Sequence, residues 1–243
     1  DSNDICVSSI AGGTDIIGCF MLGNPNLPVY PGEIQCLGLG MDVAALDDNG
    51  NALINHEGEL VCRKSFPSRP IYFLNDDNNE RINDAYFNQC PCFWTHGDFV
   101  KITDYGTVIV FGRSDATLNP GGVRIGTAEI YRQTEGLSWN EDSLCVGRPN
   151  AGDVDVVLFV KLNTGEQLTA ERIVEIKQRI KAKTTPRHVP QNIWSVTDIP
   201  YTRSGKKMEL AVSRILASRE IKNIEAVANP DCLKQYEVFQ TLK

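Results

Sequence analysis

The sequence has 243 residues, of which 42% are hydrophobic and 23% charged, and its formal net charge is −7 at pH 7. This size fits one large or two modest globular domains. The acidic balance argues against a general nucleic-acid-binding surface, which needs clustered lysine and arginine. No apolar run approaches the roughly 20 residues that span a bilayer, so we expect neither a nucleic-acid partner nor a membrane span.

Eight cysteines are spread along the chain without the compact spacing of a disulfide framework. This distribution favours a reducing, cytosolic compartment. Cys90 and Cys92 are separated by one proline, and a metal-binding or redox pair is one interpretation of that spacing. Because no second cluster of ligands accompanies them, buried or partly buried thiols are the favoured interpretation.

The apolar run at residues 5–10 predicts a strand that leads into a loop of small residues. Gly12 and Gly13 in that loop would leave room for a planar base or a phosphate. Thr14 offers a hydroxyl, and Asp15 offers a carboxylate suited to Mg²⁺. A plain turn is the alternative, and this short motif alone favours the turn.

Residues 29–111 show short strands separated by turn signals, which predicts an antiparallel β unit. Residues 41–46 and 52–54 flank an Asn-Gly dipeptide, the strongest short-range hairpin signal. Residues 99–102 and 108–111 predict a second hairpin. The sequence therefore indicates a sheet built largely from consecutive strands.

Polar residues at the ends of these strands are candidate ligand contacts. We expect Asp98 at the start of a strand, where a carboxylate accepts two hydroxyl hydrogen bonds from a ribose, although a turn-capping aspartate is locally favoured. Arg113 and Asp115 follow the apolar strand 108–111 and lie at its exit. The polar run 75–80 predicts a solvated loop.

A glycine pair follows this strand exit. Gly121 and Gly122 allow positive φ and close approach of the backbone to a ligand, and Arg124 adds a positive charge two residues later. The stretch is therefore a candidate anion site. A β-turn with solvated arginines fits the spacing equally well.

From residue 127 onward the pattern is mixed α and β. A basic, glycine-containing loop at residues 199–207 precedes the last predicted helix. The remaining predicted elements are a helix that begins at 127–131, a buried strand at 156–160, an amphipathic helix at 169–180, a strand at 193–196 and a helical tail after 229.

Four motifs occur in a fixed order, namely Gly-Gly-Thr-Asp at 12–15, His-Gly-Asp at 96–98, Gly-Arg-Ser-Asp with Gly-Gly-Val-Arg at 112–124, and Thr-Arg-Ser-Gly-Lys at 202–206. Together they resemble the adenylate-forming superfamily of acyl-CoA synthetases, luciferases and nonribosomal adenylation domains. The resemblance runs over nearly the whole chain. Residues 126–130 and 200–207 are similar to the short-chain acyl-CoA synthetase branch of that superfamily.

The resemblance implies a ligase that joins a short carboxylic acid to CoA through an acyl-adenylate. Its substrates would be small molecules, the acid, ATP and CoA, with Mg²⁺ as cofactor. The residues that it assigns to nucleotide binding are Gly12, Gly13, Thr14, Asp15, Asp98 and Arg113. Asp15 would also help to hold Mg²⁺, in a position where the superfamily usually has glutamate.

The resemblance assigns the later residues to catalysis and movement. Lys206 matches the lysine that bridges the carboxylate and the α-phosphate, and Arg124 matches an arginine near the phosphates. Gly122 matches the glycine beside the CoA pantetheine tunnel. Asp115 matches the hinge about which a C-terminal domain rotates between the half-reactions. Lys207 is a possible misassignment, but the Ser-Gly-Lys sequence fixes the register on Lys206.

The fold implied is α+β. Residues 1–114 would form the C-terminal part of the large AMP-binding domain, with a small antiparallel, barrel-like β subdomain, and residues 115–243 a mobile mixed α/β C-terminal domain. The superfamily's Ser/Thr/Gly-rich phosphate loop has no match, so we expect an incomplete chain that is inactive alone. Two hypotheses differ in which short acid is ligated, and a third is a truncated, non-catalytic nucleotide- or CoA-binding module.

Overall fold

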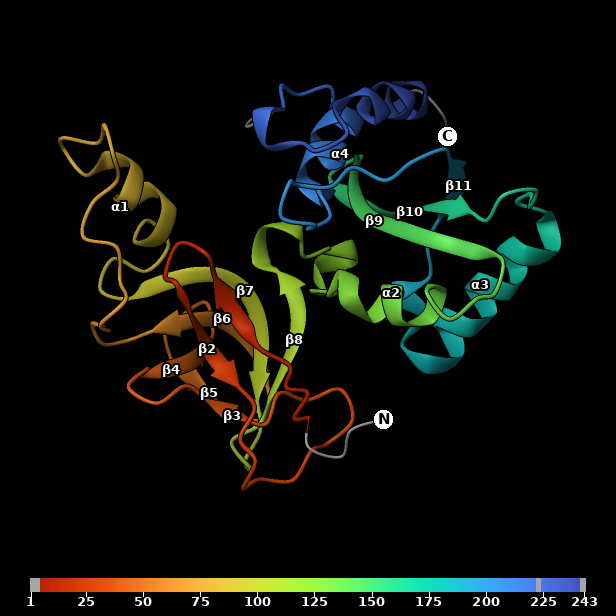
Figure 1. Ribbon diagram of the computed structural model, residues 1–243. Coiled ribbons are helices and arrows are strands. Elements are labelled where there is room, and N and C mark those ends of the chain that lie inside the picture. Colours follow the sequence, from red (N-terminus) through yellow and green to blue (C-terminus); the bar gives the residue numbers. More distant parts are fainter. Residues whose placement is uncertain (1–4, 222–223, 241–243) are drawn as a thin grey trace. The chain divides into compact units, whose positions relative to one another are not determined.

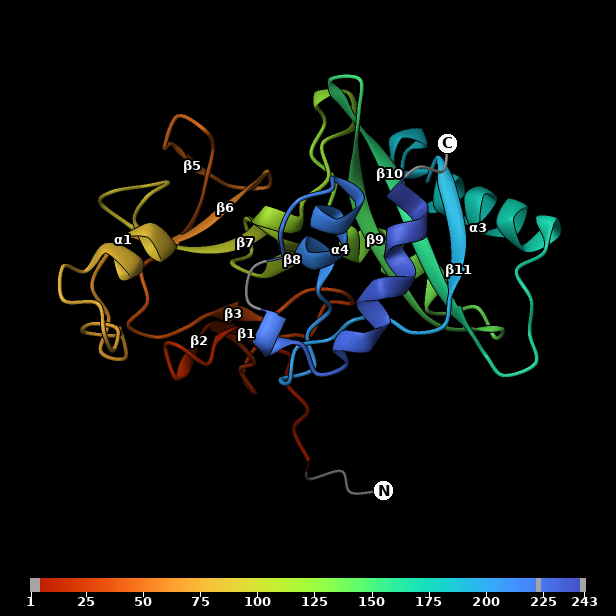
Figure 2. The same cartoon turned by 90° about the horizontal axis from the view of Figure 1, so that it is seen from above.

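The computed structural model describes residues 5–221 and 224–240. The chain divides into two compact units, of which one ends at Ser114 and the other begins at Asp115. Figure 1 and the perpendicular view in Figure 2 label the helices and strands of each unit. Each unit has its own hydrophobic core, and the two are described in turn.

The first unit is built from antiparallel strands and the helix α1 (Glu80–Tyr86). A three-stranded sheet has the order β1-β2-β3, and a five-stranded sheet has the order β5-β4-β6-β7-β8. Every strand pair in both sheets is antiparallel, as the sequence predicts. The strands are β1 (Ala11–Gly13), β2 (Gly18–Leu22), β3 (Cys36–Leu37), β4 (Val43–Leu46), β5 (Ala52–Leu53), β6 (Glu57–Cys62), β7 (Trp94–Ile102) and β8 (Val108–Arg113).

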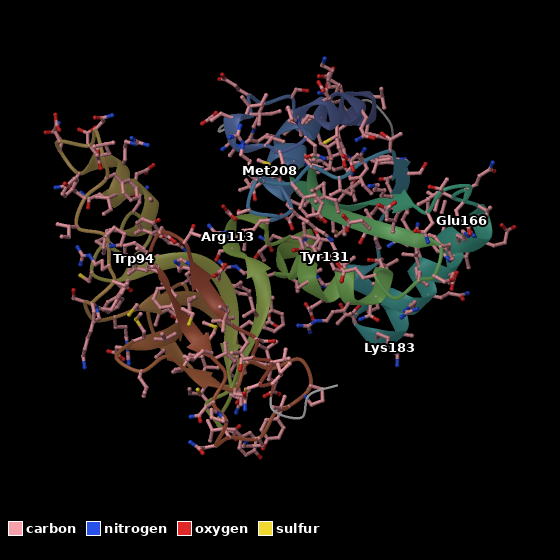
Figure 3. The ribbon with its side chains drawn as sticks, in the orientation of Figure 1. Trp94, Arg113, Tyr131, Glu166, Lys183 and Met208 are labelled. Carbon is pink, nitrogen blue, oxygen red and sulfur yellow. The ribbon has the colours of Figure 1, made fainter. Side chains whose placement is uncertain are left out.

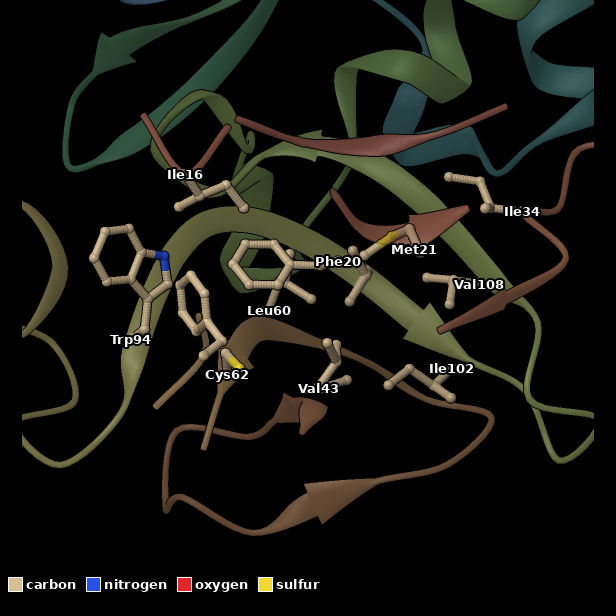
Figure 4. Close-up of a cluster of buried hydrophobic side chains, with 13 residues drawn as sticks. Ile16, Phe20, Met21, Ile34, Val43, Leu60, Cys62, Trp94, Ile102 and Val108 are labelled. Atoms are coloured by element: carbon tan, nitrogen blue, oxygen red, sulfur yellow. The ribbon is translucent and has the colours of Figure 1, made fainter. Parts of the chain in front are cut away.

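The core of this unit lies between its two sheets. Phe20 and Met21 of β2 pack with Val43, Leu60 and Val108 of the larger sheet (Figure 4). All five side chains are buried. Burying an apolar side chain of this size contributes roughly 1.5–3 kcal/mol, which offsets the conformational entropy lost on folding.

Both predicted hairpins are present. In the turn between β4 and β5, Gly50 has φ of 81° and the Asp47 carboxylate accepts the main-chain N–H of Asn49 and Asn51. β7 and β8 pair across a turn in which Gly106 also has φ of 81°. These local turn residues set the strand order over much of the sheet.

Two strand predictions in this unit are wrong. Residues 5–10 form no strand, because no described strand pairs with them, and the side chains of Ile5, Val7 and Ile10 are exposed. Asp98 does not begin a strand. β7 already begins at Trp94, which pairs with Cys62 of β6, so Asp98 lies in the middle of the strand.

The polar run 75–80 is only partly a solvated loop. The Asp76 side chain is buried, and its carboxylate accepts the main-chain N–H groups of Arg81 and Ile82, which offset the cost of burial. It therefore stabilises the first turn of α1, a helix that the polar composition concealed. Cys92 also differs from the expectation, because it is exposed, whereas Cys90 is partly buried.

The second unit is a three-stranded sheet with helices on both faces. The sheet has the order β11-β10-β9, in which β10 pairs antiparallel with β9 and parallel with β11. Its elements are α2 (Thr127–Thr134), β9 (Asn140–Asn150), β10 (Asp153–Leu162), α3 (Ala170–Lys183), β11 (Asn192–Val196) and α4 (Glu209–Leu216). Four 3₁₀ segments, Pro120–Gly122, Pro186–His188, Ile224–Ala226 and Pro230–Gln240, complete the elements that follow Ala116 in the described chain.

Alternation along β10 gives this sheet its two cores. Val157 and Phe159 pack with α4 and the Pro230–Gln240 segment, whereas Val156, Leu158 and Val160 pack with α2 and α3. Successive strand residues point to opposite faces, so the five buried residues at the centre of β10 serve both cores. Figure 1 shows α2 and α3 on one side of the sheet and α4 on the other.

The predicted strands at 156–160 and 193–196 are confirmed as parts of β10 and β11, and the three predicted helices as α2, α3 and α4. The predicted helical tail after 229 is a 3₁₀ segment. In α3, Ile176 and Ile180 are buried, and the Thr169 hydroxyl caps the helix by accepting the main-chain N–H of Arg172. Within residues 5–221 and 224–240, no helix combines the length and the hydrophobicity needed to cross a bilayer.

Candidate active site

The first motif lies in a tight β1–β2 hairpin rather than in an open loop. Gly12 and Gly13 belong to β1, and Thr14 and Asp15 occupy the turn that follows. A Cβ atom on Gly12 would lie 2.3 Å from the carbonyl oxygen of Gly18, and one on Gly13 would lie 1.9 Å from Asp15 Oδ1. Backbone contacts therefore require glycine at position 12, whereas a Cβ atom at Gly13 would displace the Asp15 and His96 side chains. The exposed Thr14 is the part of the motif that faces solvent.

Asp15 is connected to the second motif through aromatic side chains. The Tyr86 hydroxyl donates a hydrogen bond to Asp15 Oδ2, and the Tyr86 ring stacks on the indole of Trp94. Burial raises the pKa of Tyr86, and the hydrogen bond to Asp15 raises it further, so the hydroxyl stays protonated. The Trp94 indole N–H donates to Nδ1 of His96 at 3.3 Å. Since the indole only donates, a neutral His96 carries its proton on Nε2.

Hairpin register brings the second and third motifs together. Asp98 and Arg113 are direct partners across β7 and β8, and their charged groups lie 3.7 Å apart. Arg113 Nη1 also donates to the carbonyl oxygen of His96 at 2.9 Å, and His96 Nε2 lies 3.9 Å from Asp98 Oδ2. Figure 3 labels Trp94 and Arg113, which lie at the beginning of β7 and the end of β8. The strand exit therefore places an acid beside an arginine.

Gly97 and Glu59 shape this acid–arginine pair. Gly97 has φ of 81°, and a Cβ atom there would lie 2.6 Å from Arg113 Nη2. Glu59 of β6 is only 5% exposed, and its Oε1 lacks a hydrogen-bond partner within the described residues. Burial raises the pKa of the Glu59 carboxyl; the nearby Ser114 hydroxyl opposes the rise, and the Asp98 charge adds to it.

The glycine pair of the third motif has the backbone that the sequence predicts. Gly121 has φ of 57° and Gly122 has φ of 77°. The Gly121 N–H donates to Asp153 Oδ1 at 2.7 Å, and its carbonyl accepts from Arg187 Nη1 at 3.1 Å. By contrast, a Cβ atom on Gly122 would meet no described atom within 4 Å, so space is open beside this backbone. Arg124 is exposed close by in sequence.

A pocket of about 190 Å³ lies within the second unit beside the residues that follow the strand exit. Asp115 and Asn119 line one part of it, and Glu209 and Ser213 of α4 line another. Burial raises the pKa of Glu209, whose carboxylate accepts the Tyr131 hydroxyl at 3.0 Å, and the Asp115 charge adds to that rise. The segment that begins at Asp115 thus borders a partly acidic cavity.

The last motif forms a compact loop at the start of α4. The main-chain N–H of Thr202 donates to the Lys206 carbonyl at 2.8 Å, and Tyr201 and Lys207 form an isolated β-bridge. Lys206 is exposed, whereas the Lys207 ammonium lies 2.8 Å from Asp142 and 3.2 Å from Glu135. This difference favours Lys206 as the lysine available to a substrate.

The predicted residues therefore fall into two groups. Asp15, Asp98 and Arg113 are joined by contacts within the first unit, and Asp115, Gly122, Arg124 and Lys206 all belong to the second. Among the described residues, no three His, Cys, Asp or Glu side chains gather into a metal site. Motif spacing missed Tyr86, Glu59 and Asp142, because each lies far in sequence from the residue it contacts.

Comparison with known proteins indicates the same class of enzyme as the four motifs. No family model matches the chain. The chain is 49% identical over 240 residues to the acetoacetyl-coenzyme A synthetase of Rhizobium meliloti (strain 1021), covering 99% of this chain and 37% of that protein. It is 46% identical over 239 residues to the acetoacetyl-CoA synthetase of Caenorhabditis elegans, covering 96% and 34%, and 44% identical over 243 residues to that of Mus musculus, covering 99% and 36%. The chain thus spans about a third of the length of these relatives.

Solved structures give the same result. The structure of the acetoacetyl-CoA synthetase from Streptomyces lividans matches with a TM-score of 0.90 and 38% identity, covering 96% of this chain and 36% of that one. An anthranilate CoA ligase in complex with anthranoyl-AMP matches with a TM-score of 0.71 over 82% of this chain and 38% of its own. Its identity of 20% shows a likeness of fold alone.

The chain has the fold of the adenylate-forming enzymes, and its four motifs occur in the order found in that class. Within that class, the sequence blocks at 9–16, 94–99 and 115–131 predict similarity to one particular enzyme. That prediction is confirmed, since the chain is a homologue of the acetoacetyl-CoA synthetases over nearly its whole length.

Proposed function

We propose that this chain forms part of an acetoacetate–CoA ligase. In the first half-reaction, the acetoacetate carboxylate attacks the α-phosphate of ATP, which gives acetoacetyl-adenylate and releases pyrophosphate. In the second, the CoA thiol attacks the acyl carbon, which gives acetoacetyl-CoA and releases AMP. Ketone-body carbon would in this way enter fatty-acid and lipid metabolism in the cytosol. The observation that carries the proposal is the Asp98–Arg113 pair beside the Asp15 cluster, in a chain homologous to such enzymes.

The first unit would hold the nucleotide. Asp98 would accept the two ribose hydroxyls, assisted by Arg113, and the exposed Thr14 hydroxyl would meet the α-phosphate. Gly12 and Gly13 would bring the turn close to the nucleotide. Their packing against β2 and Asp15 supports this role indirectly, because it fixes the turn in place.

Asp15 fits a Mg²⁺ ion that is shared with the substrate. Mg²⁺ is usually held by one or two protein carboxylates together with substrate phosphates and water, and a cluster of three protein ligands is not required. Tyr86 orients the Asp15 carboxylate through one oxygen and leaves the other for a cation. Bound there, the ion would supply positive charge to the phosphates during displacement.

The second unit would supply the groups that change between half-reactions. Lys206 would bridge the carboxylate and the α-phosphate, where its charge stabilises the in-line displacement, and Arg124 would lie near the phosphates. Gly122 would border the CoA pantetheine during thioester formation, which the open space beside its backbone supports. Asp115 would be the hinge of a mobile C-terminal domain, and the division of the chain at this residue supports that role.

Further architectural proposals follow from the same assignment. The two sheets of the first unit would form a barrel-like subdomain at the C-terminal end of a larger AMP-binding domain, and residues 115–243 would be the C-terminal AMP-binding domain. The chain lacks a match to the superfamily's phosphate loop, so we expect it to be inactive alone. Its partners would be acetoacetate, ATP and CoA, with no nucleic acid.

ATP–pyrophosphate exchange tests this function. We would measure exchange with acetoacetate, acetate, propionate and butyrate, using the complete protein that contains this chain and the 243-residue chain itself. Exchange by the complete protein that is strongest with acetoacetate would support the proposal. A preference for another acid would show that this other acid is the substrate. Absence of exchange with every acid would instead favour a nucleotide- or CoA-binding module.

A further inference from the structure

The loop that carries Lys206 is held at its two stems. Tyr201 and Lys207 pair as a β-bridge, and the Lys206 N–H donates to Thr202 Oγ1 at 3.0 Å. Gly205 has φ of 78° and donates its N–H to the Thr202 carbonyl at 2.9 Å. The turn is therefore tight, and its position in the second unit depends on what holds Tyr201 and Lys207.

One carboxylate on β9 contacts both stems. Asp142 Oδ2 accepts the Tyr201 hydroxyl at 2.5 Å, and Asp142 Oδ1 lies 2.8 Å from the Lys207 ammonium. Oδ1 also accepts the main-chain N–H of Ser143 at 2.7 Å, which fixes the carboxylate rotamer. The side chains of Asp142 and Lys207 are 18% and 15% exposed, so water screens the pair only partly.

Two further contacts hold the Lys207 ammonium. It lies 4.1 Å from the ring centre of Tyr131 and 3.2 Å from Glu135 Oε1. The Tyr131 hydroxyl in turn donates to Glu209, at the first residue of α4. Figure 3 labels Tyr131 on α2 and Met208 just before α4. The Lys207 ammonium is thus paired with carboxylates of the protein itself, whereas Lys206 makes no ion pair with any described residue.

We infer that Asp142 is the positioning residue for the reactive lysine, acting through Tyr201 and Lys207 without touching substrate. This inference rests on the proposed ligase function for its catalytic consequence, but not for its geometry. A loop held at both stems presents Lys206 in a narrow range of positions. A misplacement of about 1 Å in such a group costs up to about 100-fold in rate.

Lysine labelling tests the geometry without any catalysis. The 243-residue chain would be treated briefly with formaldehyde and a borohydride reagent, and methylation at Lys206 and Lys207 would be quantified by mass spectrometry. We expect Lys206 to react several times faster than Lys207 in the wild type. In Asp142→Asn, the Lys207 rate should rise towards that of Lys206. Glu141→Gln is the matched control, because Glu141 pairs with Lys161 instead of the loop.

Half-reaction kinetics test the positioning role in the complete protein. Asp142→Asn should lower kcat for ATP–pyrophosphate exchange at least about tenfold, with little change in KM for ATP. Thioester formation from supplied acetoacetyl-adenylate should change less than about twofold, because Lys206 acts in adenylation alone. Tyr201→Phe removes only one hydroxyl and should show the same pattern more weakly, which keeps the test decisive if Asp142→Asn folds poorly.

The outcomes separate the two proposals. Equal labelling of Lys206 and Lys207 in the wild type, or unchanged Lys207 labelling in Asp142→Asn, would overturn the positioning role. Exchange by Asp142→Asn equal to that of Glu141→Gln would also overturn it. A wild-type protein that exchanges with no acid would overturn the ligase function instead, and the labelling result would still decide whether Asp142 holds the loop.

Discussion

The rings of Tyr86 and Trp94 stack with centroids 3.7 Å apart and planes inclined by 16°. Tyr86 donates to Asp15 and Trp94 donates to His96, so this one aromatic pair joins the first two motifs of the chain. Stacked aromatic rings bury a large apolar area and hold their polar ends in fixed directions. The orientation of the Asp15 carboxylate therefore depends on a helix residue 71 positions away.

Tyr86→Phe should separate the hydroxyl from the stacked ring. A lost hydrogen bond to a charged acceptor destabilises by about 1.5–3 kcal/mol, and Asp15 loses its orienting donor. We expect a lower unfolding midpoint in urea for the 243-residue chain and a higher KM for Mg-ATP in the complete protein. Tyr30→Phe is the control, since Tyr30 stacks on Tyr105 at the surface. Equal effects of both variants on KM would remove the proposed role of the Tyr86 hydroxyl.

Gly97→Ala should displace the Arg113 guanidinium. The added Cβ atom would lie 2.6 Å from Arg113 Nη2, in a backbone with φ of 81°. Gly106→Ala provides a matched control, because its φ is also 81° but no atom lies within 4 Å of the added Cβ. Both variants should lose about 1–2 kcal/mol of stability from backbone strain.

Only Gly97→Ala should weaken nucleotide binding, since only it disturbs the contacts of Arg113 with Asp98 and His96. We expect KM for ATP to rise about tenfold in that variant, consistent with loss of a hydrogen bond from a charged donor. Urea unfolding and ATP titration of both variants check this. If Gly106→Ala raises KM as much, strain alone explains the effect.

Lys206→Ala should abolish adenylation and spare thioester formation. The ammonium would contact the carboxylate and α-phosphate in the first half-reaction only, so ATP–pyrophosphate exchange should fall by a factor of about 100 or more. Conversion of supplied acetoacetyl-adenylate and CoA to thioester should stay within about twofold of wild type. Lys234→Ala, another exposed lysine of the second unit, controls for loss of charge. Equal loss in both half-reactions would contradict the role given to Lys206.

Glu59 should make the chain less stable as pH rises. Its carboxyl has a pKa above the usual 4.5 in the folded state because of burial, so the folded protein holds this proton more tightly than the unfolded one. The stability that this provides is complete below about pH 4.5 and is lost as pH rises through the folded pKa. Glu59→Gln cannot ionise, so its thermal midpoint relative to wild type should increase between pH 4.5 and pH 7.5.

Thermal midpoints of both proteins across this pH range check the sign. Glu80→Gln, at an exposed position in the first turn of α1, is the control. Midpoint curves for wild type and Glu59→Gln that run parallel with pH would show that the carboxyl ionises equally in the folded and unfolded chain.

Local patterns predicted much of the fold. The five apolar residues at 156–160 form the centre of β10, which is covered on both faces. Glycine turns at Gly50 and Gly106 predicted both hairpins correctly. The helix α1 could not be predicted in this way, because only Ile82 of its seven residues is buried and Asp76, which accepts N–H groups of its first turn, lies in a polar run. The formation of α1 therefore depends on tertiary contacts rather than on a local apolar pattern.

The candidate site divides in the same manner. Asp98 and Arg113 come together through one register between two strands that follow each other in the chain, and the sequence predicted that hairpin but not its register. Asp142 contacts Tyr201 across 59 residues, and Asp15 contacts Tyr86 across 71. Such pairings depend on the packing of whole elements, which periodicity within one segment does not encode.

The glycines of the first motif and Lys206 would respond differently to mutation if selection for activity were lost. Gly12 is required by the backbone of the β1–β2 hairpin, and a Cβ atom at Gly13 would displace the Asp15 and His96 side chains, so substitution there would harm packing whether or not a nucleotide binds. Lys206 is exposed and contributes no ion pair to the described fold, so selection for stability would not retain it. In a descendant that had lost activity, the glycine motif would survive and Lys206 would be replaced early. The identity of residue 206 would therefore report loss of activity earlier than the glycine motif would.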